Sequence, residues 1–148
     1  MRTLIVLLFT LSSSLKIIGF TYQGRLYPVY QQPLNQISYI YNDAADITQM
    51  WTDQFDGQVL FAHRYFLAGE VFASLELYDT VKINYYSGEE IIYIVRGFDT
   101  VKIGDPIDTV KYYDDPNILV MQTCIDDEYA LIVIAEVFDK RGYKPQKD

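Results

Sequence analysis

The chain has 148 residues and carries 12 lysines and arginines against 20 acidic residues, which gives a formal net charge of −8 at pH 7. Nucleic acid and anionic lipid repel a surface of this charge, so we expect neither as a partner. Cys124 is the only cysteine, which excludes an internal disulfide, so stability must come from the hydrophobic core.

The N-terminus is typical of a secretory signal peptide. Met1 and Arg2 precede an apolar run over 4–11, which is too short to span a bilayer. Small residues follow this run, and we expect cleavage before Phe20. Residues 1–19 are then the signal peptide and 20–148 form one domain. The protein is therefore predicted to be secreted and extracellular, without stable insertion in a membrane after cleavage.

The composition of the remaining chain favours strands, because 14 tyrosines and 8 phenylalanines accompany many β-branched residues. A first strand is predicted over 21–30, where Pro28 confines it to an edge or a bend. Residues 37–41 alternate in polarity and predict a short extended segment.

The segment around Asp56-Gly57 allows two interpretations. Apolar residues over 47–55 stand at helical spacing. However, Asp-Gly between two apolar runs is a strong hairpin signal, because a type I′ turn needs positive φ at both central positions. We favour the hairpin, whose second strand covers 58–66.

Beyond Gly69 the predicted strands are short and closely spaced. They cover 70–77, 80–86, 90–96, 100–103 and 109–113. Turn formers separate most of them, which is typical of an antiparallel sandwich or barrel. The total of about eight to ten strands matches what a small closed barrel needs.

The stretch from Asn117 to Phe138 predicts a final hairpin. Two apolar, β-rich runs flank the acidic turn Asp126-Asp127-Glu128. Since nearly every position in both runs is apolar, we expect both faces of each strand to be buried.

The residues that could carry chemistry form no catalytic signature. His63 is the only histidine and is predicted to be a packed or surface residue. Cys124 is predicted to be a buried small hydrophobe beside the hairpin turn, with an intermolecular bridge or a reactive thiol as the alternative. Acidic pairs in turns are usually solvated, so no catalytic residue, metal or cofactor is expected; calcium at Asp114-Asp115 or Asp126-Asp127 is the alternative.

Three motifs resemble the lipocalin family. In the stretch over 120–133 the positions that fit the family's second conserved region are Thr123, Asp126, Tyr129 and Ala130. The Asp56-Gly57 hairpin is similar to the family's turn between its second and third strands. Gly24-Arg-Leu-Tyr27 is similar to the family's opening Gly-x-Trp-Tyr, with Leu26 in the place of the tryptophan.

The resemblance implies an all-β fold, an antiparallel up-and-down β-barrel of about eight strands, lipocalin-like. It also implies a secreted carrier or scavenger that binds a small hydrophobic molecule and is not an enzyme. Inward side chains would bind the ligand, and those expected are Tyr39, Trp51, Phe61, Phe72, Ile83, Tyr85, Tyr93, Met121 and Leu131.

Two other functions compete with the carrier. The first is a secreted acidic β-domain that acts on another extracellular protein through a tyrosine-rich surface, as a protein-binding module or inhibitor. The second is a hydrolase with a pair of facing carboxylates. An exposed aromatic patch would favour the first, and two acids across a cleft the second.

Overall fold

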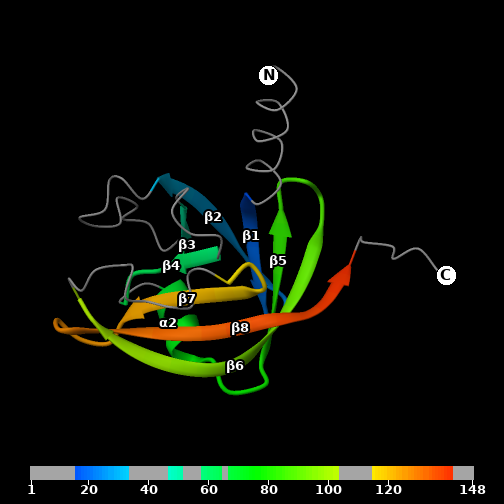
Figure 1. Ribbon diagram of the computed structural model, residues 1–148. Helices are drawn as coiled ribbons and strands as arrows, with labels where there is room; N and C mark the ends of the chain where they lie inside the picture. The colour runs from blue at the N-terminus through cyan, green and yellow to red at the C-terminus, as the bar shows by residue number, and fades with distance from the viewer. Residues whose placement is uncertain (1–15, 34–46, 52–57, 65–66, 104–114, 142–148) are drawn as a thin grey trace.

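The computed structural model describes residues 16–33, 47–51, 58–64, 67–103 and 115–141. Its elements are β1 (Ile17–Tyr22), β2 (Arg25–Pro33), β3 (Ile47–Trp51), β4 (Gln58–Phe61), α2 (Leu67–Ser74), β5 (Thr80–Tyr85), β6 (Glu90–Lys102), β7 (Ile118–Cys124) and β8 (Tyr129–Arg141). The strands close into a barrel in the order β1-β2-β3-β4-β7-β8-β6-β5 (Figure 1). The prediction of an all-β closed barrel of about eight strands is confirmed.

The barrel begins with a hairpin where one strand was predicted. Gln23 and Gly24 both have positive φ, 49° and 77°, and join β1 to β2 in the backbone conformation that a tight hairpin needs. The single strand predicted over 21–30 is therefore wrong. The turn was not predicted because Gln23 is not a typical turn residue. Ile17, inside the predicted signal peptide, is fully buried in β1 and pairs with Tyr85 of β5.

Two pairs of neighbouring strands are parallel, β2 with β3 and β4 with β7. The sheet therefore differs from the antiparallel meander that the lipocalin resemblance implies. In the second pair Gln58 lies opposite Leu119 and Phe61 opposite Gln122. Because parallel strands run in the same direction, the residues after β4 and the last residues of β7 meet at the same edge of the barrel.

The strands of the two predicted hairpins are present. β3 and β4 pair antiparallel, with Thr48 opposite Phe61, so the strand interpretation is right and the helical one is wrong for 47–51. The Asp56-Gly57 turn itself lies outside the described residues. β7 and β8 form the final hairpin, in which Val120 lies opposite Ile134.

The strand predicted over 70–77 is wrong, because α2 occupies most of it. Val71, Ala73, Leu75 and Leu77 alternate with other residues, which favours a strand, but Ala73 and Leu77 are exposed. The buried residues Ala68, Phe72 and Leu75 instead follow helical spacing. The Phe72 ring packs edge-to-face on Phe20 of β1, with 5.4 Å between ring centroids, so α2 contributes to the core.

The remaining predicted segments have two different outcomes. The strands predicted over 90–96 and 100–103 are one continuous strand, β6, which pairs with β8 and shifts register between Val95 and Gly97. The segments predicted over 37–41 and 109–113 lie outside the described residues.

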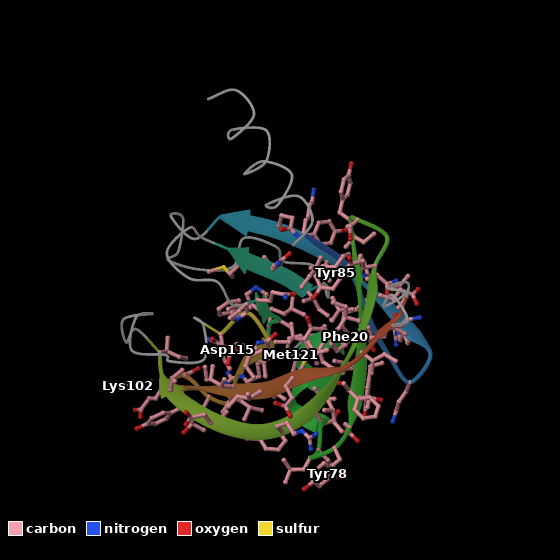
Figure 2. The ribbon with its side chains drawn as sticks, turned by 45° about the vertical axis from the view of Figure 1, so that its right-hand side comes forward. Phe20, Tyr78, Tyr85, Lys102, Asp115 and Met121 are labelled. Carbon is pink, nitrogen blue, oxygen red and sulfur yellow. The ribbon has the colours of Figure 1, made fainter. Side chains whose placement is uncertain are left out.

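The barrel strands bury side chains on both of their faces. Inside the barrel, Phe20 and Met121 belong to the main core cluster, and Figure 2 shows both within the ring of strands. On the opposite face of β4, β7 and β8 a second cluster contains Val59, Val120 and Ile132, all with no exposed surface. The prediction that both faces of the final hairpin are buried is thus confirmed for the middle of the hairpin, whereas Cys124, Tyr129 and Phe138 near its ends are exposed.

Candidate active site

The structure places most of the predicted ligand-binding residues in the core. Six belong to the main core cluster or pack against it: Phe72, Ile83, Tyr85, Tyr93, Met121 and Leu131. Phe61 does not join them, because β4 turns Leu60 inward and leaves Phe61 on the outward face with the second cluster. Tyr39 and the side chain of Trp51 lie outside the described residues.

The polar tips of two of these residues bind one another. The Tyr85 hydroxyl donates to Oε1 of Gln58 and lies 2.6 Å from the Tyr93 hydroxyl, to which Nε2 of Gln58 donates at 3.3 Å. Burial raises the pKa of both tyrosines. The group is internally hydrogen-bonded, as buried polar groups generally are, and it joins β4, β5 and β6 through the interior. Ligand contact by these core residues is tested by no observation and stays a prediction.

Cys124 lies at the end of β7, and its surface is exposed. The prediction of a buried cysteine is therefore wrong. Strand alternation is the reason: Thr123 points inward and is 3 % exposed, so the next side chain points out just where the strand ends. A free thiol at this position is open to reaction.

The end of β4 brings His63 and Arg64 to the same edge of the barrel. The ladder between β4 and β7 continues one step past β4, because the N–H of Ala62 donates to the carbonyl of Gln122 at 3.1 Å. In this register the next residue, His63, comes level with Cys124. His63 is half-buried, and its Nε2 atom has no exposed surface.

Arg64 binds the turn that follows Cys124. Its Nη1 donates to the carbonyl of Ile125 at 3.0 Å, and its Nη2 lies 3.4 Å from Oδ1 of Asp127. The Arg64 side chain is 24 % exposed, whereas that of Asp127 is 98 % exposed, so the guanidinium is the more enclosed partner. These contacts hold a positive charge beside the thiol.

The neighbouring charges act on the thiol in opposite directions. Desolvation by the surrounding atoms raises the pKa of Cys124, the Arg64 guanidinium opposes this rise, and Asp126 and Asp127 add to it. A nearby cation favours the thiolate, which is the nucleophilic form of cysteine. The site therefore contains one group that activates Cys124 and two that restrain it.

The turn between β7 and β8 has a fixed shape. Oδ1 of Asp126 accepts the N–H groups of Glu128 and Tyr129 at 2.7 and 2.8 Å, and these hydrogen bonds lower the pKa of Asp126. The N–H of Ile125 donates to the carbonyl of Tyr129 at 2.9 Å. This network positions the two turn oxygens that Arg64 binds.

A thiol, an imidazole and a guanidinium at one edge supply a nucleophile, a proton carrier and a charge stabiliser. Within the described ranges, which do not include Asp114, no group of three or more His, Cys, Asp or Glu residues could hold a metal ion. This site was not predicted from the sequence. The available signal was a lone cysteine and a lone histidine, each at the end of an apolar run, since the two can meet in space to form a catalytic pair.

A scan against protein-family models gives no match, and a search of curated proteins gives none either. Solved structures do match. Sortase C from Clostridium perfringens SM101 has a TM-score of 0.63 and 17% identity, and covers 84% of this chain and 71% of its own. Sortase A from Listeria monocytogenes has a TM-score of 0.63, 14% identity, and coverages of 84% and 88%. A lid mutant of sortase A from Corynebacterium diphtheriae has a TM-score of 0.62, 17% identity, and coverages of 83% and 70%.

These likenesses overturn the lipocalin resemblance, because the structural neighbours are sortases. The predictions of a carrier or scavenger of small hydrophobic molecules, of a protein-binding module or inhibitor, and of a chain that is not an enzyme are wrong. The predicted partners, a small hydrophobic molecule and possibly another extracellular protein, are wrong for the same reason. The motifs misled because they describe local hairpins, which many barrels share, and not the parallel pairing of β4 with β7. The chain has the fold of the sortases.

Proposed function

We propose that this protein is a sortase-like cysteine transpeptidase, which cleaves an amide bond of a peptide substrate through Cys124 and transfers the acyl group to an amine. One observation carries the proposal. Cys124 is exposed at the end of β7, at the edge where the parallel strand β4 delivers His63 and Arg64. The likeness to sortases of known structure supports the same chemistry.

The first half of the reaction forms a thioester. The Cys124 thiolate attacks the amide carbonyl, and a tetrahedral intermediate with a negatively charged oxygen forms. When this intermediate collapses, the C–N bond breaks and His63 gives its proton to the leaving amine. The acyl group then remains on sulfur, and His63 is neutral.

The second half regenerates the enzyme. An incoming amine attacks the thioester carbonyl while neutral His63 accepts the proton that the amine loses. The C–S bond breaks, the thiolate leaves, and a new amide forms. Water in the place of the amine would give hydrolysis by the same steps.

Arg64 stabilises charge in both halves. Its guanidinium favours the thiolate, as the direction of its effect on the Cys124 pKa indicates. The guanidinium, held at this edge by its contacts to Ile125 and Asp127, also places a positive charge where it can stabilise the negative oxygen of the intermediate. Because the turn already holds the Arg64 side chain, less conformational entropy is lost during the reaction than with a freely rotating arginine.

The half-buried side chains on the outward face of the strands are a suitable contact surface for a peptide. Strand alternation puts the second cluster on the same face as Cys124. Phe61, Val101 and Gln122 are half-buried there, so part of this face is open to solvent. An extended peptide with apolar side chains fits such a face, with its scissile carbonyl at Cys124.

Trapping of the acyl-enzyme tests the proposal without a known substrate. The folded chain is incubated with a peptide library and hydroxylamine. Hydroxylamine converts the thioester of the acyl-enzyme to a hydroxamate, and the products are identified by mass spectrometry. We expect hydroxamates from the native protein and none from Cys124→Ala. His63→Asn should form them about 100-fold more slowly or worse. The exposed helix substitution Ser74→Ala is the control and should behave as native. Equal product from Cys124→Ala would reject the proposal.

We also propose that the protein is exported from the cell. The charged start at Arg2 and the apolar run over 4–11 support export. In the described part of the chain no helix is long and apolar enough to cross a membrane. N-terminal sequencing of protein collected outside the producing cells tests the proposal. A new N-terminus at or before Lys16 is expected because it leaves β1 complete, and retention of all protein inside the cell contradicts export.

A further inference from the structure

The first turn of α2 touches the backbone that follows β4. An ideal Cβ atom built on Gly69 would lie 1.9 Å from the carbonyl oxygen of His63, 2.6 Å from its carbonyl carbon and 3.1 Å from Cα of Arg64. Real Cβ contacts essentially never fall below 3.0 Å, so the two distances to the His63 carbonyl cannot occur. The neighbouring atoms belong to the backbone, so no side-chain rotation can relieve the overlap. Only glycine fits at this position unless the helix or the segment moves.

Glycine is otherwise a poor choice in a helix. Relative to alanine it lowers the stability of a helix. Gly69 has no positive φ that would demand it, unlike Gly24 and Gly88. The close approach to His63 is therefore the reason for glycine here.

The helix has little freedom to retreat from His63. Phe72 is fully buried and packs on Phe20, while Ala68 and Leu75 are 1 % and 4 % exposed. A shift of α2 would break these contacts in a close-packed core. A side chain at position 69 would instead displace the backbone of His63 and Arg64, which follows the end of β4.

We propose that Gly69 is a positioning residue for the transpeptidation proposed above. By allowing α2 to rest against the His63 carbonyl, it sets the place of His63 and Arg64 relative to Cys124. Small displacements in such a constellation have large effects, since a misplacement of about 1 Å can cost about 100-fold in rate. The inference rests on the proposed function, because His63 and Arg64 matter to rate only if Cys124 reacts.

Alkylation of Cys124 tests the inference. The rate of reaction with iodoacetamide is measured between about pH 5 and 10 for the native protein, Gly69→Ala and Gly97→Ala, together with the thermal midpoint of unfolding. Gly97 is the matched control, since a Cβ there meets nothing within 4 Å. Displacement of Arg64 should raise the Cys124 pKa, so we expect Gly69→Ala to react about tenfold more slowly at pH 7, with a profile moved to higher pH. Gly97→Ala should keep the native profile.

A native alkylation profile in folded Gly69→Ala would overturn the inference. If Gly69→Ala does not fold, Val71→Ala replaces it: Val71 is half-buried against the core, and its truncation loosens the seat of α2 without adding atoms near His63. Val71→Ala should move the profile in the same direction by a smaller amount, and an unmoved profile would again overturn the inference. Failure of the proposed function has a different signature, namely no hydroxamate from the native protein.

Discussion

At the scale of single residues, Asp127 opposes the activation of Cys124. Its carboxylate shares Arg64 with the Ile125 carbonyl, and its charge raises the pKa of the thiol. Asp127→Asn removes the charge and leaves a side chain of the same shape. The Cys124 pKa should fall, so alkylation below that pKa should become about two- to threefold faster and its midpoint should move to lower pH.

The effect of Asp127→Asn is expected to be small because this carboxylate is 98 % exposed and screened by solvent. Glu76→Gln removes one exposed charge that has no part in the Cys124 shift, and it serves as the control. Added salt should reduce the difference between native protein and Asp127→Asn. A slower Asp127→Asn variant would mean that Asp127 positions Arg64 more than it restrains Cys124.

The residues that we propose to be catalytic were partly accessible from the sequence. A lone histidine and a lone cysteine, each ending an apolar run, were visible, but their meeting depends on pairing between β4 and β7. The sequence also left open on which face of β7 the thiol lies, since a shift of one residue exchanges Thr123 and Cys124. Arg64 carried no signal of its own, because its partners Ile125 and Asp127 are distant in sequence.

At the scale of elements, β1 needs its first residues. Ile17 is fully buried, its N–H donates to Oε1 of Gln49 at 2.8 Å, and its carbonyl accepts from Nε2 of Gln31 at 2.8 Å. A chain that starts at Phe20 should lose about 3 kcal/mol or more of its free energy of unfolding relative to one that starts at Lys16, from lost apolar burial and lost hydrogen bonds.

Urea unfolding of the two truncated chains checks this prediction. The chain that starts at Lys16 is the control, because it keeps all of β1. Equal midpoints would show that Ile17 does not contribute to the barrel.

The helix α2 shows why one element type was misassigned. The segment over 70–77 was predicted as a strand because short strands follow it at close intervals. The spacing of Val71 and Leu75, four residues apart, satisfies both a period of two and a helical period. Packing decides between them. Phe72 reaches Phe20 inside the barrel, a contact between residues far apart in sequence that no local pattern contains.

At the scale of the whole molecule, the closed barrel was predictable and its strand order was not. Short strands with frequent turns leave few alternatives to a barrel or sandwich. The strand order depends on which strands are neighbours in the sheet without being consecutive in sequence. β4 and β7 are such a pair, because α2, β5 and β6 lie between them in the chain. This crossover makes β4 and β7 parallel and thereby assembles the site. Local motifs describe hairpins only, so they predicted a meander and with it the wrong function.

The buried hydroxyls of Tyr85 and Tyr93, which with Gln58 join β4, β5 and β6, should make the stability of the barrel sensitive to alkaline pH. Burial raises the pKa of Tyr85 and Tyr93 above the ordinary value of about 10. The folded state therefore keeps protons that the unfolded chain releases at high pH. The contribution of these two tyrosines to the free energy of unfolding is therefore fully present below about pH 10. It is lost as the pH rises above this value, because the unfolded state then binds fewer protons than the folded state.

Tyr85→Phe should lower stability at pH 7 by about 1–2 kcal/mol, since it removes the hydrogen bonds to Gln58 and Tyr93. It should also make the loss of stability above about pH 10 less steep, because one shifted group is gone. Urea unfolding at a series of pH values measures both effects, with the exposed Tyr86→Phe as control. Tyr86→Phe should keep the native slope, and a native slope in Tyr85→Phe would show that the buried hydroxyl group does not couple the barrel to pH.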